Sequence, residues 1–393
     1  MNILFYRYGS ICEEDILKCF AESGHKCITI EDEIRDKSIT GADSVRLVDA
    51  ALQEKPFDCV FTVNFYPSIS DLCNVYHIRY ISWVVDSPVL ELFASSISNE
   101  WNRVFVFDRR QYEDICEFNP ARIFHYPLAV DTRAKQDVIA EAVSSGSAKK
   151  FACDLSFVGS LYSEKDPMND LKDASQYLKG FLEGICEAQL KVYGYYFADE
   201  LLSGGIIDDF KSCVENYYTM KCDNHLTDKV IIGQYYLGNH ITSLERQRLI
   251  ELVAENHPTD VYTRSDTGPI KSANCRGGCQ TLTEMPVIFH ESRININPTS
   301  KAIRSGIPLR VFDILACEGF MLSNYQTELC ELFVPGEDFV YYDSIEQVPE
   351  LVNYYLDHEN ERREIAHNGY IKVKEQYSYM VRLNGLLLKS FEN

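Results

Sequence analysis

The first thirty residues, MNILFYRYGSICEEDILKCFAESGHKCITI (1–30), decide the fold class of this chain. Two short apolar runs, at 3–8 and 27–30, flank a segment that begins at Ser10 and ends at Gly24. That segment has a serine suited to capping a helix, acidic residues in its first turn, apolar residues at helical spacing and a terminal glycine. Strand, helix and strand in this order predict one βαβ unit and therefore a parallel sheet.

The same alternation continues along the chain. Further apolar runs that predict strands lie at 58–65, 80–86, 103–108 and 122–128. Because helix-length segments separate these runs, we expect a Rossmann-like N-terminal domain over residues 1–135.

A second α/β pattern follows a polar stretch. The stretch RAKQDVIAEAVSSGSAKK (133–150) contains a Ser/Gly cluster, which predicts a linker over 136–150. Runs at 154–160, 189–195, 259–263, 292–297, 319–324 and 338–342 then predict a second Rossmann-like domain over 151–375. The interval 198–256 breaks the alternation and predicts a helical insertion in that domain. Two such domains leave a cleft where the carboxyl ends of both sets of strands can face each other.

The composition excludes several classes of function. The 393 residues carry 38 basic and 59 acidic side chains, a formal net charge of −21, so we expect no binding to nucleic acid. No apolar stretch approaches the length of a membrane span, and the N-terminus lacks the order of a signal peptide, which together predict a cytoplasmic protein. The 14 cysteines are scattered, and we interpret Cys275 and Cys279 as a loop coincidence rather than a metal site. The oligomeric state stays open, a homodimer included.

Two segments have the composition of an anion site. In FVGSLYSEKDP (157–167), the backbone of Gly159 and Ser160 and the side chain of Lys165 can face a phosphate, although an ordinary strand-to-helix turn is the alternative. In INPTSKAIRSGIPLRVFDILACEGFMLSN (296–324), a turn precedes a short apolar helix, as suits a diphosphate. The candidate contacts are Arg304, Ser305, Gly306, Ile307, Pro308, Leu309 and Arg310 for the diphosphate and Asp313 for a ribose. The alternative is a capped core helix with solvated arginines.

Several of these motifs resemble those of a known protein family. The stretch 284–382 resembles the C-terminal half of glycosyltransferases of the GT-B class, and is similar to their bacterial spore-maturation-type subgroup. The stretches MNILFYRYGSICEEDI and YISWVVDSPVLEL resemble the domain that usually precedes it. The resemblance implies two Rossmann-like domains facing across a cleft, with a last helix, residues 376–393, that crosses back to the N-terminal domain.

The resemblance also assigns roles to residues. Related enzymes hold the donor with a Glu-x7-Glu pair; here the ribose acid is retained as Asp313, whereas the sugar-contacting acid is replaced by Ser305. The loop with Lys165 would approach the diphosphate. Two further sets are implied: a base-recognition loop of Thr263, Ser265 and Asp266, for which a surface turn is the alternative, and an acceptor-side loop of Tyr6, Arg7 and Gly9.

The best candidate for a catalytic base is Asp86. It follows a predicted strand in WVVDSP, where a carboxylate can face the cleft and take a proton from an acceptor hydroxyl. The alternative is a helix cap before Pro88. We interpret His77, His125 and His290 as structural.

The predicted function is that of a metal-independent glycosyltransferase. It would move a sugar from a nucleotide-diphosphate donor, a UDP-sugar by frequency among similar enzymes, to a glycan or protein acceptor. No cofactor beyond the nucleotide sugar is expected. The alternatives are a catalytically silent nucleotide-sugar-binding or assembly protein and a GT-B nucleotide-sugar epimerase.

Overall fold

The computed structural model describes residues 1–392, except for the side chains of Lys165, Asn169 and Asp170. The chain forms two compact units. The first comprises residues 1–130 and 219–226 and the C-terminal segment from Tyr377; the second comprises 131–218 and 227–376. The chain therefore passes between the units at four points.

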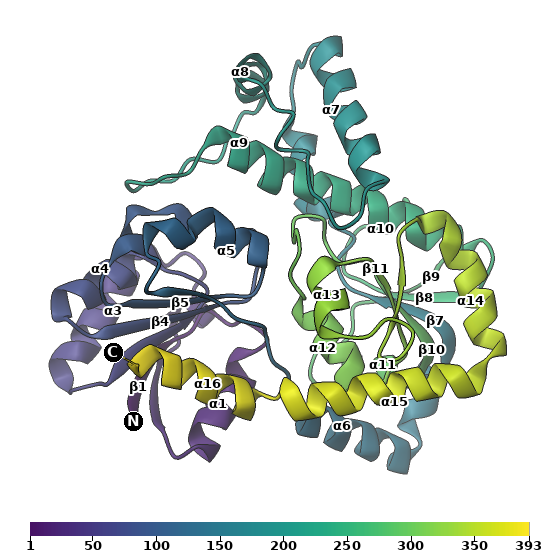
Figure 1. The fold of residues 1–393 in the computed structure, drawn as a ribbon, viewed down its shortest axis with the longest axis horizontal. Coiled ribbons are helices and arrows are strands. Elements are labelled where there is room, and N and C mark those ends of the chain that lie inside the picture. The colour runs from purple at the N-terminus through teal and green to yellow at the C-terminus, as the bar shows by residue number, and fades with distance from the viewer. Residues whose placement is uncertain (393) are drawn as a thin grey trace. The chain divides into compact units, whose positions relative to one another are not determined.

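The first unit is built on a six-stranded parallel sheet (Figure 1). The strand order is β2-β1-β3-β4-β5-β6. The strands are β1 (Asn2–Tyr6), β2 (Lys26–Ile30), β3 (Cys59–Val63), β4 (Arg79–Val84), β5 (Asn102–Val106) and β6 (Ile123–His125). The helices are α1 (Glu13–Glu22), α2 (Asp32–Arg35), α3 (Gly41–Glu54), α4 (Pro67–Tyr76), α5 (Arg109–Ile115) and α16 (Tyr379–Phe391). All six runs expected in this part of the chain form strands, because helices cover both faces of a parallel sheet and its central strands are buried along their whole length.

Helix α16 completes the first unit from the far end of the chain, and it lies beside α1 (Figure 1). It buries Leu383 and Leu386. The carbonyl oxygen of Ser390 accepts hydrogen bonds from Nε of Arg79 and Nε of Arg103, both at 3.1 Å. The end of this helix is therefore tied to the first residue of β4 and to β5.

We expect Leu386→Ala to destabilise the first unit. The side chain is 0% exposed, so its truncation leaves a cavity, which costs about 2–5 kcal/mol of unfolding free energy. Leu388→Ala, two residues along the same helix, is the matched control, because Leu388 is 67% exposed and should change the value by less than about 0.5 kcal/mol. Urea unfolding followed by tryptophan fluorescence measures both; equal effects would contradict this packing.

Residues 219–226 also pack within the first unit, although they come from the predicted insertion. The backbone N–H of Ser95 donates to the carbonyl of Asp223 at 2.8 Å, and that of His225 donates to Phe93 at 2.8 Å. The ring of His225 stacks on Phe118 with centroids 4.3 Å apart. The sequence pattern does not predict that residues 219–226 pack in the first unit, because this segment forms one isolated antiparallel bridge and no strand.

The second unit contains another six-stranded parallel sheet, of order β12-β11-β10-β7-β8-β9. Its strands are β7 (Cys153–Val158), β8 (Thr259–Tyr262), β9 (Asn274–Gly277), β10 (Ser292–Asn297), β11 (Met321–Asn324) and β12 (Val340–Tyr342). Its helices are α6 (Thr132–Ser145), α7 (Gln176–Leu190), α8 (Gly204–Cys213), α9 (Asp228–Val230), α10 (Gly238–Ala254), α11 (Met285–Glu291), α12 (Leu309–Ala316), α13 (Thr327–Leu332), α14 (Val348–Asp357) and α15 (Glu359–Gln376). A seven-residue π-helical segment, Ile231–Leu237, leads into α10.

The expected strand at 189–195 is wrong. The segment is the end of α7 followed by a turn, which the side-chain amide of Gln189 holds together. Its nitrogen donates to the carbonyls of Val192 and Tyr195 at 3.2 and 2.9 Å, and its oxygen accepts from the N–H of Phe197 at 2.8 Å. The sixth strand is instead β9.

The expected linker at 136–150 is wrong as well. It is mostly helix α6, which packs against α11 within the second unit. Asp131 caps this helix by accepting from the N–H of Ala134 at 2.9 Å. Gly146, from the Ser/Gly cluster, ends it in the left-handed conformation with φ +76°. The cluster is therefore a helix terminus and not a flexible tether.

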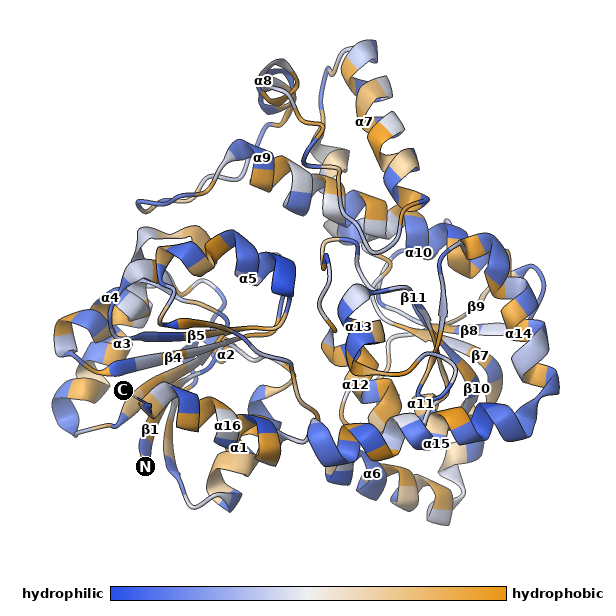
Figure 2. Ribbon diagram, viewed as in Figure 1, coloured by the Kyte–Doolittle hydropathy of each residue, from blue (hydrophilic) through white to orange (hydrophobic). Residues whose placement is uncertain are grey.

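The interval 198–256, predicted as a helical insertion in the second domain, is helical at 204–213 and 228–254, but 214–227 is irregular and 219–226 belongs to the first unit. Helix α10 buries Leu249, Ile250 and Val253 against the sheet and is the crossover from β7 to β8. Hydrophilic and hydrophobic residues alternate along α7, α10, α15 and α16 (Figure 2). Within residues 1–392, no helix is both long and apolar enough to cross a membrane.

Candidate functional site

The loops that follow β7 and β8 meet at the carboxyl edge of the second sheet. The N–H of Gly159 donates to the carbonyl of Tyr262 at 3.1 Å, and that of Leu161 donates to Oγ of Ser265 at 2.8 Å. The N–H of Ser265 in turn donates to Oγ1 of Thr263 at 3.1 Å. The predicted phosphate loop and base loop therefore lie together, with the buried Thr263 and Ser265 holding their shape.

Other residues of these two loops have different surroundings. Oγ of Ser160 donates to Glu164 at 2.6 Å and accepts from the N–H of Tyr162 at 2.8 Å. Asp266 is exposed, and its carboxylate accepts from the N–H of Gly268 at 3.1 Å. The side chain of Lys165 lies outside the described residues.

Arg246, on α10, reaches this edge and is absent from the sequence prediction. Its Nη1 donates to the carbonyl of Ser160 at 2.6 Å, while Nε and Nη2 donate to the carbonyl of Pro298 at 3.2 and 2.9 Å. Its guanidinium also lies over the ring of Tyr162, 4.7 Å from the centroid. Arg246 thus joins the loop after β7 to the loop after β10.

Arg310 adds a second positive charge near Arg246. Burial lowers the pKa of Arg246, while the charges of Tyr162 and Glu245 raise it and that of Arg310 lowers it. Arg310 itself packs on α11, with Nη1 2.7 Å from the sulfur of Met285 and the guanidinium 5.3 Å from the ring centroid of Phe289. A guanidinium group held at a strand edge, as Arg246 is, suits the binding of a diphosphate.

A buried polar network shapes the loop after β10. The side chain of Asn324 accepts from the N–H of Thr299 at 2.9 Å and donates to its carbonyl at 3.1 Å. Oγ of Ser300 lies 2.9 Å from Oγ1 of Thr242 on α10. The predicted donor segment therefore begins from a fixed backbone.

Ser305 lies beside a carboxylate. Its Oγ donates to Oε1 of Glu328 at 2.7 Å, and Glu328 is 1% exposed. The side chain of Ser305 thus contacts an acid, which comes from the start of α13. Because Glu328 lies 23 residues after Ser305, the sequence pattern does not predict this contact.

The remaining donor candidates surround the start of α12. Gly306 and Ile307 are buried, Pro308 precedes the helix, and Arg304 and Leu309 are partly exposed. Asp313 is buried, and its Oδ1 lies 3.2 Å from Nζ of Lys135 on α6. Its carboxylate is therefore already paired within the second unit.

In the first unit, Asp86 belongs to a cluster at the carboxyl edge of the sheet. The amide nitrogen of Asn64 donates to Oδ2 of Asp86 at 2.7 Å and to the hydroxyl of Tyr8 at 3.0 Å. Asp86 is exposed, and its other oxygen makes no hydrogen bond with any described residue. Burial raises the pKa of Tyr8, and the charge of Asp86 raises it further.

The segment around Asp86 is a fixed loop rather than a helix start. The peptide bond between Ser87 and Pro88 is cis, and the next helical turn begins only at Leu90. The side chain of Gln111 accepts from the N–H of Val89 at 2.6 Å and donates to the carbonyl of Asp86 at 3.3 Å. Asp86 therefore does not cap a helix.

Two of the three acceptor-side candidates, Arg7 and Gly9, contact a buried acid, Glu13. The third, Tyr6, contacts Glu33 instead. Glu13 accepts from Nε of Arg7 at 3.2 Å and from the N–H of Gly9 at 3.0 Å. Arg7 is further paired with Glu14 and Glu31, at 2.5 and 2.9 Å. The hydroxyl of the buried Tyr6 donates to Glu33 at 2.8 Å. These bonds shape the loop after β1, and Tyr8 in the same loop contacts the Asp86 cluster through Asn64.

The three histidines have ring or backbone contacts. His77 ends α4 in the left-handed conformation beside Trp101, His125 lies 3.2 Å from the carbonyl of Phe107, and His290 lies 2.9 Å from the carbonyl of Cys317. Throughout the part of the chain that the structure describes, no three His, Cys, Asp or Glu side chains gather as metal ligands.

Comparison with known families connects the second unit to sugar transfer. Residues 246–387 match the family described as "Glycosyl transferase-like". This region begins at Arg246 and includes Asp313 and Glu328. No curated protein matches the chain.

Solved structures share the fold over the whole chain. Sucrose-phosphate synthase from Thermosynechococcus elongatus is 11% identical, with a TM-score of 0.57 and coverage of 100% of this chain and 99% of that one. HepE from Anabaena, in complex with UDP and glucose, is 9% identical, with a TM-score of 0.54 and full coverage of both chains. A glycosyltransferase from Rickettsia africae is 10% identical, with a TM-score of 0.54 and coverage of 99% and 97%. The two six-stranded parallel sheets therefore form the GT-B fold.

Proposed function

We propose that this protein is a glycosyltransferase that moves a sugar from a UDP-sugar donor to a glycan or protein acceptor. The match over residues 246–387 and the GT-B fold support this activity. UDP is the nucleotide bound in the HepE structure, which supports its choice as the donor nucleotide. Neither metal nor cofactor has a part in the proposed reaction.

One observation carries the proposal: the guanidinium of Arg246 lies where the loops after β7 and β10 meet, bonded to a carbonyl of each. The leaving group of glycosyl transfer is a nucleoside diphosphate, whose developing charge must be stabilised as the glycosidic bond breaks. The guanidinium of Arg246 at this strand edge suits that task without a metal ion, and we propose that Arg310 adds a second positive charge. Of the predicted phosphate loop, the N–H of Ser160 would contact the same diphosphate, because the N–H of Gly159 already donates to Tyr262.

Carboxylates would carry the other steps. Asp86 would accept the proton of the acceptor hydroxyl, because one of its oxygens is exposed and makes no hydrogen bond with a described residue. Glu328 would supply the carboxylate that Ser305 lacks. Asp313 would hold the ribose with the carboxylate oxygen that does not contact Lys135.

The test is a thermal-shift measurement in EDTA with UDP, GDP and dTDP, followed by a transfer assay with the matching labelled sugars. UDP at 100 times its Kd should add about 2.7 kcal/mol of stability and raise the melting temperature by several degrees, because it binds only the folded chain. A label that then moves to a glycan or peptide acceptor supports the transferase. Binding of UDP with neither transfer nor hydrolysis would favour the silent binding protein, and interconversion of the sugar would favour the epimerase. No shift with any nucleotide would contradict the proposal.

A further inference from the structure

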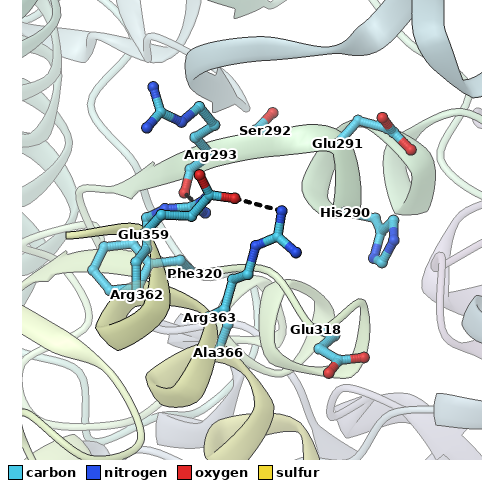
Figure 3. Close-up of a pocket in the computed structure, with 10 residues that line it drawn as sticks. All are labelled: His290, Glu291, Ser292, Arg293, Glu318, Phe320, Glu359, Arg362, Arg363 and Ala366. Carbon is cyan, nitrogen blue, oxygen red and sulfur yellow. Dashed lines mark hydrogen bonds and ion pairs between the residues drawn. The ribbon is translucent and has the colours of Figure 1, made fainter. Parts of the chain in front are cut away.

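A cavity of about 590 Å³ lies in the second unit, and none of the candidate donor residues lines it, although His290 does (Figure 3). Ser292 and Arg293, the first residues of β10, line it, as does Phe320, which precedes β11. It therefore lies at the amino edge of the parallel sheet, whereas the candidate donor residues lie at the carboxyl edge. Its volume is within the range of small-molecule sites.

Three guanidinium groups line this cavity, those of Arg293, Arg362 and Arg363. Two of them have carboxylate partners. Arg363 lies 2.5 Å from Glu359, the pair drawn by a dashed line in Figure 3, and Arg293 lies 3.1 Å from Asp154. These two arginines are half-exposed or exposed, so solvent screens both pairs.

Arg362 differs from both. It is 8% exposed, and its Nη1 donates to the carbonyl of Arg293 at 2.7 Å. Its Nε is buried without a hydrogen-bond acceptor, and no carboxylate of the described residues forms an ion pair with it. A buried guanidinium that forms no ion pair is costly, and an oxyanion in the cavity would supply an opposite charge.

Three glutamates also line the cavity, and two of them have basic partners. Glu318 lies 2.6 Å from Nδ1 of His367, and Glu359 is paired with Arg363. Glu291 is the third, and Figure 3 shows it on the other side of the cavity from Arg362. Carboxylates accept hydrogen bonds from hydroxyl groups. The cavity thus combines an anion-binding side with a side suited to hydroxyls.

We infer that this cavity binds a small hydroxylated phosphate ester, with its phosphate on Arg362 and its hydroxyl groups toward Glu291. Phosphate fits better than a single carboxylate because its double charge and three terminal oxygens match several guanidinium groups. The site is separate from the nucleotide site of the proposed function, so it would hold a regulator rather than a substrate.

Isothermal titration calorimetry of the full chain with ribose 5-phosphate tests this inference, with ribose and inorganic phosphate as further ligands. Wild type should bind ribose 5-phosphate and should bind ribose far more weakly. Arg362→Gln should weaken the binding of ribose 5-phosphate by at least about tenfold, because it removes a charge-assisted contact. Inorganic phosphate should bind, but more weakly than the ester, because it makes no contact with Glu291.

Three more variants make the test decisive. Arg363→Gln, at an exposed position, should weaken binding by a few-fold, and it decides the question if Arg362→Gln does not fold. Arg248→Gln is the matched control, an exposed arginine of the same unit paired with Glu187. Arg246→Gln tests the nucleotide site. Unchanged binding in both cavity variants, absence of binding by wild type, or loss only in Arg246→Gln would overturn the inference. Binding of UDP, measured on the same proteins, tests the proposed function separately.

Discussion

Replacing Arg246 by glutamine should weaken the binding of UDP by roughly 10- to 100-fold. The reason is that a charge-assisted hydrogen bond to a phosphate is worth about 1.5–3 kcal/mol, and glutamine supplies no charge. Uridine, which has no phosphate, should bind the variant as well as it binds wild type. Calorimetry with UDP and uridine on both proteins measures the difference.

The comparison with uridine separates binding from structure. Arg246 also donates to the carbonyls of Ser160 and Pro298, so its loss could disturb the whole site. A disturbed site would bind UDP and uridine equally poorly. Arg248→Gln is the control on the same helix, because Arg248 pairs with Glu187 at the surface. If Arg246→Gln bound UDP with wild-type affinity, our assignment of Arg246 to the diphosphate would be wrong.

Much of the fold is predictable from sequence because parallel strands covered by helices are apolar along their length. This is why the runs that became β3 and β5 were recognised, with every residue of both strands buried. Strand β9 has the opposite character. All four of its residues, Asn-Cys-Arg-Gly, are exposed at the edge of the sheet, so hydrophobicity gives no signal for it.

The two wrong assignments have a common physical origin. The segment 189–195 has the composition of a strand, yet one side-chain amide, that of Gln189, makes the bonds of a turn. The stretch 136–150 has the polarity of a linker, yet one face of α6 packs on α11. In both segments, contacts made in the folded chain override local composition.

The candidate site was only partly accessible to sequence reasoning. The loops with Gly159 and Ser265 could be found because each follows a strand, and parallel strands end at one edge. Arg246 and Glu328 lie on helices, and only tertiary structure brings them to that edge. The sequence does contain one indication of Arg246. Its neighbour Glu245 lies one turn before Leu249, at a position where helical periodicity predicts an apolar residue.

Replacing Asp86 by asparagine should lower the rate of sugar transfer by about 100- to 10,000-fold, the range expected when a general base is lost. Asparagine is nearly isosteric and can still accept the hydrogen bond from Asn64, so the loop should keep its shape. The affinity for UDP should stay unchanged, because the proposed nucleotide contacts all belong to the second unit.

The measurement is the initial rate of UDP release from the UDP-sugar at saturating acceptor, together with calorimetry of UDP binding. Asp71→Asn is the matched control: Asp71 is an exposed aspartate of the first unit that accepts a hydrogen bond from Asn99. Its rate should equal that of wild type. A fall in rate with unchanged UDP affinity is the result expected for a lost base. A group that takes the acceptor proton stabilises the transition state and does not contribute to binding of the nucleotide in the ground state. An Asp86→Asn enzyme with wild-type turnover would instead mean that the acceptor loses its proton to another group, and the exposed oxygen of Asp86 would then have no part in the chemistry.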